Sequence, residues 1–245
     1  MPFVSAGATQ RGPQHMARSE PRQDALAIRH HGDGVLLALA DGAGSASRGG
    51  AGAALAVRTA VQVMNGTQPD AEALEDAVFA AKTALNDSAT QHGLTPRDLA
   101  TTLLLVAATP SSAIAAHVGD GAVVLRTAGE WLTLSPPARG MHASTTHFLT
   151  DAAGPDLRIT THDGPPTAIA AFTDGIERLV LAEPEQTPHA PFFDKMTAPL
   201  RAASGGFGRN QFLSRALADY LAAPAVAERS EDDKTLALAV PAKTR

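Results

Sequence analysis

Asp41, Asp174 and Asp232 are the residues whose type and placement point most clearly to chemistry, because each lies in a short polar loop beside an apolar segment. A carboxylate in such a loop is anchored by a buried strand and still reaches solvent. If the three side chains converge, each raises the pKa of the others, and they cannot all stay ionised without a cation. Carboxylate, carbonyl and water oxygens are the usual ligands of Mg²⁺ and Mn²⁺. The sequence therefore predicts a metal site built from oxygen ligands.

Composition limits the classes of protein to consider. Of the 245 residues, 44% are hydrophobic but only 4% are aromatic, which predicts an aliphatic core in one large domain or two small ones. The net charge is -5 and no basic stripe is visible, so nucleic acid is not expected as a partner. The chain has no cysteine, which excludes disulfides and thiolate catalysis. The first residues lack the charged and apolar regions of a signal peptide, and we expect none.

Periodicity predicts a chain of both helices and strands. Residues 99–119 carry no Asp, Glu, Lys or Arg, but Thr, Ser and Pro interrupt them, so we expect two buried strands and no membrane helix. Short connections make neighbouring strands antiparallel, and the order of elements is typical of an α+β fold. Residues 135–167, rich in Pro, Gly, Thr and His, are expected to hold an irregular excursion, and residues 182–209 are a second, weaker candidate for one. The predicted strands are Thr102–Ala107, Ala113–Val118, Ala122–Arg126, Trp131–Leu134 and Thr235–Val240, and the predicted helices are Gly50–Met64, Ala71–His92 (capped by Asp70) and Asn210–Leu221.

A glycine-rich loop, residues 41–50, follows a predicted strand and precedes a predicted helix, which is the setting of a dinucleotide-binding loop. Ser47 stands where that fingerprint requires its third glycine, and Asp41 would repel a pyrophosphate. If Asp41 binds a metal ion instead, Gly42 can present its carbonyl to the ion. We therefore favour the metal site over a nucleotide site.

Six short motifs span residues 23 to 235. In chain order they are Gln23-Asp24-Ala25, Ala40-Asp41-Gly42-Ala43-Gly44, Thr101-Thr102-Leu103, Val118-Gly119-Asp120-Gly121, Phe172-Thr173-Asp174-Gly175-Ile176-Glu177 and Asp232-Asp233-Lys234-Thr235. An Asp-Gly pair alone usually marks a turn, so the specific signal is the ordered set. In this set the chain resembles the metal-dependent Ser/Thr protein phosphatases of type 2C, especially their compact bacterial members.

The resemblance implies a four-layer α-β-β-α sandwich of two antiparallel sheets flanked by helices. It implies one phosphatase domain over residues 1–245, and we expect residues 1–10 and 242–245 to be flexible ends. The implied enzyme is a cytoplasmic phosphatase of phosphoserine and phosphothreonine in proteins, acting on the substrate of a Ser/Thr kinase. In such a site two Mg²⁺ or Mn²⁺ ions activate a water molecule for in-line attack on phosphorus.

The resemblance also implies a role for each site residue. Asp41, Asp174 and Asp232 would form the catalytic metal centre, in which Asp41 bridges both ions and the Gly42 carbonyl binds one of them. Asp24 would hold water on the metal, and Asp120 would occupy a looser position for a third ion. The bound phosphate would be held by Arg18 or Arg22, and His15 is a further candidate.

Several residues depart from the family pattern. Gln23 stands where family members commonly carry Glu, and Ala43 stands where the animal enzymes carry a histidine that serves as general acid. Asp233 replaces the usual Asn of the last motif. The spacing of Arg18 and Arg22 from the first acidic motif fits neither arginine well.

Two other functions are compatible with the same fold. A phosphoprotein-binding module with weak activity would be expected to lack at least one metal aspartate, whereas this chain retains them all. A phosphatase of a small phosphoester would use the same chemistry with a different pocket.

Overall fold

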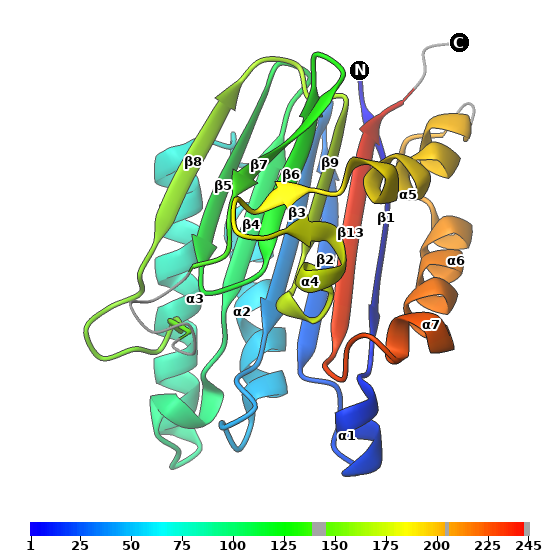
Figure 1. Ribbon diagram of the computed structural model, residues 1–245. Coiled ribbons are helices and arrows are strands. Elements are labelled where there is room, and N and C mark those ends of the chain that lie inside the picture. Colours follow the sequence, from blue (N-terminus) through cyan, green and yellow to red (C-terminus); the bar gives the residue numbers. More distant parts are fainter. Residues whose placement is uncertain (139–145, 204–205, 243–245) are drawn as a thin grey trace.

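The computed structural model describes residues 1–138, 146–203 and 206–242, and two packed sheets with helices on both outer faces make up its architecture (Figure 1). The first sheet is antiparallel and has the strand order β2 (Asp24–His31), β3 (Gly34–Asp41), β4 (Leu103–Ala108), β5 (Ser112–Val118) and β8 (Arg158–Asp163). The second has the order β12 (Gly208–Arg209), β1 (Phe3–Gln10), β13 (Lys234–Pro241), β9 (Ala168–Phe172), β6 (Ala122–Thr127) and β7 (Glu130–Ser135). Its strands are antiparallel except for the short parallel pair β1 and β12.

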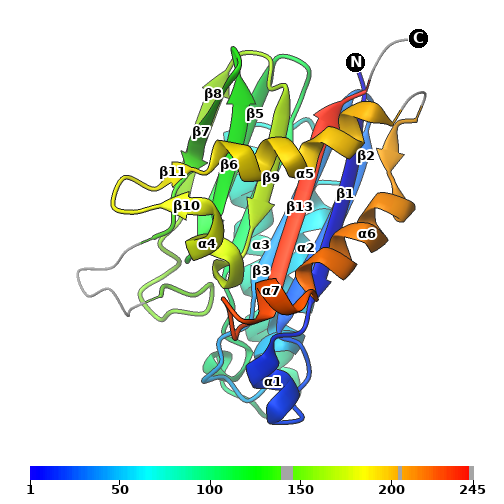
Figure 2. The same ribbon diagram turned by 45° about the vertical axis from the view of Figure 1, so that its right-hand side comes forward.

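Helices cover the outer face of each sheet. Helices α2 (Gly49–Val63) and α3 (Ala71–Gln91) pack on the five-stranded sheet through an aliphatic cluster. Helices α5 (Ala190–Ala202) and α6 (Gln211–Leu221) cover the other sheet (Figure 2). The shorter elements are α1 (Pro13–Ala17), η1 (Pro96–Leu99), α4 (Asp174–Val180), α7 (Pro224–Ala227) and the hairpin of β10 (Leu181–Ala182) and β11 (Thr187–Pro188). This arrangement confirms the expected four-layer α-β-β-α sandwich.

A third aliphatic cluster fills the space between the sheets. Leu37 and Leu39 from β3 meet Val123 and Leu125 from β6 there. Because helices cover the outer faces, residues on both sides of β3, β4 and β9 are buried. This double burial explains why these strands are continuous apolar runs in the sequence and show no period-two alternation.

The regular elements confirm most of the sequence predictions. The five predicted strands and three predicted helices occur within about two residues of their expected ends. Asp70 caps α3 by accepting a hydrogen bond from the Ala73 backbone N–H at 2.8 Å. Asn210 caps α6 in the same way, through the Leu213 N–H at 2.9 Å.

Three stretches differ from the expectation in whole or in part. The predicted flexible end at residues 1–10 contains β1, which pairs with β13 along its whole length, and its small residues fit a strand covered on both faces. The stretch 135–167 holds the predicted irregular excursion at 136–138 and 146–157, and residues 139–145 lie outside the described part of the chain. It also contains the edge strand β8, whose polar sequence masks its pairing with β5. The stretch 182–209 contains α5 and the strand β11. Of the other expected flexible end, residues 243–245 lie outside the described part of the chain.

Strand direction brings the predicted site residues to one end of the sandwich. Asp41 ends β3, directly opposite Asp24 at the start of β2. Asp174 follows β9, and Asp232 precedes β13, whose start pairs with the end of β9. This is the end at which α1 lies, away from both termini (Figure 1).

Membrane insertion is not indicated by the helices. Within the described residues, none of them has both the length and the apolar character needed to cross a bilayer.

Candidate metal centre

Five of the six predicted metal ligands line one cavity. Asp41, Asp120 and Asp174 each place a carboxylate oxygen within 4.8 Å of the others. The cavity, of about 180 Å³, is lined by these three residues together with Asp232 and Gly42. A cluster of this size could hold small hard cations.

Asp41 is fixed by the neighbouring Thr101-Thr102 pair. Its backbone N–H donates to Thr102 Oγ1 at 2.9 Å, and its carbonyl accepts from Thr101 Oγ1 at 2.8 Å. Gly42 must be glycine, because a Cβ there would lie 2.2 Å from the Gly49 carbonyl carbon. The threonine motif and the glycine-rich loop therefore act together to set the direction of the Asp41 carboxylate.

Asp120 lies where the chain crosses from the first sheet to the second. Gly119 and Gly121, on either side, have φ of 102° and 83°, which a residue with a side chain adopts only with strain. The Asp120 carboxylate accepts a hydrogen bond from Thr146 Oγ1 at 2.8 Å. The crossover thus brings a carboxylate from β5 to the cluster formed by the other strands.

Asp174 and Asp232 come from two loops that are in close contact. Asp174 begins α4, and a Cβ on Gly175 would lie 1.8 Å from the Asp233 carbonyl oxygen. Only glycine allows α4 to start so close to the 232–233 loop. Lys234, which is buried, donates to the Asp232 carbonyl at 2.8 Å and so places a positive charge behind the cluster.

Asp24 is buried beneath the cavity and is not part of its lining. Its Oδ2 accepts hydrogen bonds from Thr173 Oγ1, at 2.8 Å, and from Thr235 Oγ1. These two threonines stand inside the sequence motifs, beside Asp174 and Lys234, but their role was not predicted. We therefore propose that Asp24 acts on the metal centre from behind, next to Asp41.

The carboxylates form an anionic cluster that a bound cation would stabilise. Burial, followed by the neighbouring aspartates, raises the pKa of Asp41 well above its usual value. The same causes raise the pKa of Asp174 to about 7, and burial raises that of Asp24 to about 7 despite its threonine partners. Asp24 Oδ1 and Asp174 Oδ1 are buried and have no hydrogen-bond partner among the described residues. A set of buried, unpartnered carboxylate oxygens fits Mg²⁺ or Mn²⁺.

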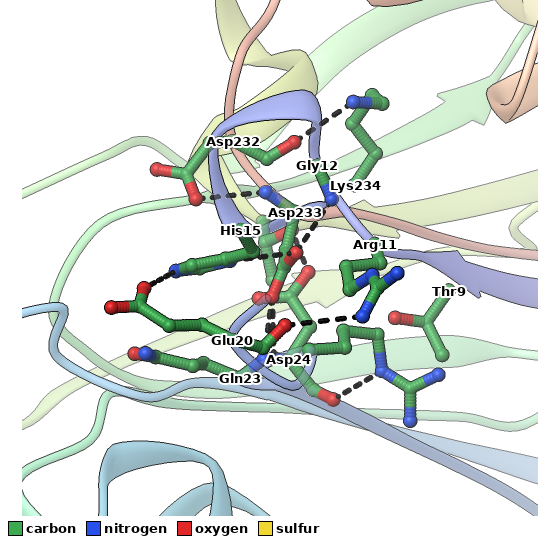
Figure 3. A network of polar contacts seen from close by, with 12 residues as sticks. Thr9, Arg11, Gly12, His15, Glu20, Gln23, Asp24, Asp232, Asp233 and Lys234 are labelled. Carbon is green, nitrogen blue, oxygen red and sulfur yellow. Dashed lines mark hydrogen bonds and ion pairs between the residues drawn. The ribbon is translucent and has the colours of Figure 1, made fainter. Parts of the chain in front are cut away.

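The three candidates for phosphate binding have different positions. Arg18 is exposed and lines the cavity, whereas Arg22 is outside the lining and its Nε donates to the Asp24 carbonyl at 2.9 Å. His15 also lines the cavity, but it is buried and contacts Asp233 (Figure 3). The geometry therefore favours Arg18 and His15 over Arg22.

Partly buried carboxylates around a small cavity, at the end of a four-layer sandwich, define a divalent-metal hydrolase. Sequence comparison assigns the family: the chain belongs to the protein phosphatase 2C family, whose profile matches residues 11–222. It is 38% identical over 242 residues to Serine/threonine-protein phosphatase 3 of Escherichia coli (strain K12), and the match covers 94% of each chain.

Solved structures share the fold at low sequence identity. The catalytic domain of the serine/threonine protein phosphatase PstP, solved in complex with two manganese ions, has a TM-score of 0.69 and 18% identity, covering 98% of this chain and 99% of that one. Serine/threonine phosphatase Stp1 from Staphylococcus aureus has a TM-score of 0.66 and 16% identity, covering 96% and 94%. These matches agree with the expected α-β-β-α fold.

Proposed function

We propose that this chain is a metal-dependent phosphatase that removes phosphate from phosphoserine and phosphothreonine in proteins. The observation that carries the proposal is the convergence of Asp41, Asp120, Asp174 and Asp232 on one cavity in a chain of this family. The name of the Escherichia coli relative supports the substrate class. We further propose that residues 1–245 act as one domain, in the cytoplasm, on proteins that a Ser/Thr kinase has phosphorylated, and that nucleic acid is not a partner.

The donor set indicates which residues would hold the metal. Asp41 and the Gly42 carbonyl would serve one ion, and Asp41, Asp174 and Asp232 the other, with Asp120 available for a further ion. When bound, the ions would supply positive charge that lowers the pKa of water and balances charge on the phosphoryl oxygens. The two manganese ions in the PstP structure support this arrangement.

Residues around the cavity would orient the metal-binding carboxylates. The threonine contacts to Asp41 and Asp24 orient the two carboxylates, and the glycines let the loops approach each other. Thr146 and Phe148 also line the cavity. The anionic cluster repels a phosphate ester unless cations are present, so substrate binding should depend on metal.

Hydrolysis of p-nitrophenyl phosphate and of a phosphothreonine peptide tests the proposal, with Mn²⁺, with Mg²⁺ and after treatment with EDTA. We expect turnover of both substrates with metal and loss of turnover with chelator. Asp41→Asn is the matched control, and it should lose about 10²-fold or more in kcat. Turnover that survives thorough removal of metal would contradict the proposal. Binding of the phosphopeptide without turnover would instead favour a binding module, and turnover of small esters alone would favour a small-molecule phosphatase.

A further inference from the structure

His15 is a buried imidazole in the wall of an otherwise acidic cavity. It lies on α1 and is 6% exposed. Helix α1 is fixed to the loop before β13, since the Gln14 N–H donates to the Glu231 carbonyl at 3.0 Å and Gly12 packs directly on Asp232. The ring position is therefore set by contacts between the two ends of the chain.

Asp233 lies against one side of the His15 ring. Its Oδ1 lies 2.9 Å from His15 Nδ1, a close contact that lacks the geometry of a hydrogen bond. Asp233 is 1% exposed, and its carboxylate also accepts the backbone N–H groups of Gly12, at 2.7 Å, and Gln23. A carboxylate with these backbone partners cannot turn freely, so it is a fixed neighbour of the imidazole (Figure 3).

The other side of the ring faces a replaceable partner. His15 Nε2 is 3.9 Å from Glu20 Oε2, which is longer than a hydrogen bond, and the Glu20 side chain is 43% exposed. Carboxylate oxygens thus lie near both ring nitrogens, at 2.9 Å from Nδ1 and at 3.9 Å from Nε2. A phosphoryl oxygen entering the cavity could take the place of Glu20 and accept the Nε2–H hydrogen bond.

We propose that His15, positioned beside Asp233, is the side chain that donates a hydrogen bond from Nε2–H to the phosphoryl group of the substrate. This inference rests on the proposed function and specifies how its site holds phosphate. It also accounts for two departures of this chain from the family pattern. Neither Arg18 nor Arg22 has the spacing of the family's phosphate-binding arginine, and Asp233 stands where the last motif usually has Asn, in contact with His15. Arg18 is exposed on the rim of the same cavity, and we assign it a smaller contribution to phosphate binding.

Binding of inorganic phosphate tests the proposal directly. The inhibition constant for phosphate and the KM for a phosphothreonine peptide should be measured with saturating Mn²⁺ for wild type, His15→Gln, His15→Arg and Arg18→Ala. We expect His15→Gln to weaken both by about 10- to 100-fold, as for loss of a hydrogen bond to a charged group, with a smaller change in kcat. His15→Arg should restore much of the binding. His31→Gln, at the opposite end of β2, is the histidine control and should match wild type.

A double-mutant cycle tests the pairing of His15 with Asp233. His15→Arg combined with Asp233→Asn restores the family pattern, so the double variant should bind phosphate better than Asp233→Asn alone. Additive effects of the two changes would overturn the role of Asp233. Wild-type phosphate binding in folded His15→Gln, or a loss confined to Arg18→Ala, would overturn the role of His15. A parallel loss of Mn²⁺ affinity and melting temperature, with no selective loss of phosphate, would also overturn it.

A measurement on the unaltered protein covers the case in which His15→Gln does not fold. In ¹⁵N-histidine NMR, the ring signals of His15 are those that are present in the wild type and missing from the His15→Arg variant. With Mg²⁺ present, added phosphate should shift these signals. Unchanged signals at saturating phosphate would contradict the proposal. Phosphate should also raise the melting temperature of the wild type, even if no phosphoprotein is hydrolysed. Failure of the phosphatase assay and failure of the His15 proposal can therefore be told apart.

Discussion

Asp24 lies behind the cavity, outside its lining, and next to the residues that form it. It is opposite Asp41 in the β2–β3 register. Its position depends on two hydroxyl donors from the side of the other sheet, Thr173 just after β9 and Thr235 in β13. A carboxylate held between the two sheets connects the packing of the sandwich to the charge balance of the site.

The hydroxyl of Thr173 should therefore affect metal affinity. Thr173→Val keeps the β-branched shape but removes the donor to Asp24 and the acceptor for the Thr235 N–H at 3.1 Å. Because the threonine hydroxyls lower the pKa of Asp24, their loss should raise it further and favour a neutral carboxyl. We expect the Mn²⁺ midpoint for activation to rise about 10- to 100-fold. Thr161→Val, on the exposed side of β8, is the control, and equal midpoints for both variants would contradict the assignment.

At the scale of elements, the sequence predicts strands and helices where apolar periodicity is strong. Asp41 and Asp174 could be located because the strands before them are uniformly apolar. Strand β1 was missed because its residues are small and weakly hydrophobic, and β8 because it is a polar edge strand. The choice between Arg18 and Arg22 could not be made from spacing. It depends on how α1 folds back onto the loop before β13, which is a contact between distant parts of the chain.

Helix α4 packs closely against the loop before β13, and we therefore expect two glycine substitutions to differ in their effect on stability. Gly175→Ala places a methyl group 1.8 Å from the Asp233 carbonyl, so the loops carrying Asp174 and Asp232 must move apart. We expect a loss of about 1–3 kcal/mol in the free energy of unfolding, together with loss of activity. Gly44→Ala meets no atom within 4 Å and should change stability by less than about 0.5 kcal/mol. Urea unfolding of both variants measures the difference, and similar stabilities would show that the close approach is not required.

At the scale of the whole molecule, the acidic cluster links folding to protons and metal. The raised pKa values of Asp24, Asp41, Asp120 and Asp174 mean that the metal-free folded protein binds protons more tightly than the unfolded chain. The stability that comes from these bound protons is present at low pH, and it is lost as the pH rises to about 7 and beyond. His117 has the opposite effect on the pH dependence of stability. Burial lowers its pKa to about 3, so below about pH 6.5 the unfolded chain binds a proton there that the folded protein does not bind. Above that pH the carboxyl groups dominate.

The metal-free protein should consequently melt at a higher temperature at about pH 6 than at about pH 8. Saturating Mn²⁺ should raise the melting temperature most at the higher pH, because the cation then replaces the protons that the carboxylates have lost. Asp174→Asn removes one of the raised carboxyls, so its melting temperature in EDTA should depend less on pH than that of the wild type. Thermal melts at the two pH values, with EDTA and with Mn²⁺, test this expectation. A metal-free protein that is more stable at the higher pH would show that the carboxylates do not repel one another as this structure implies.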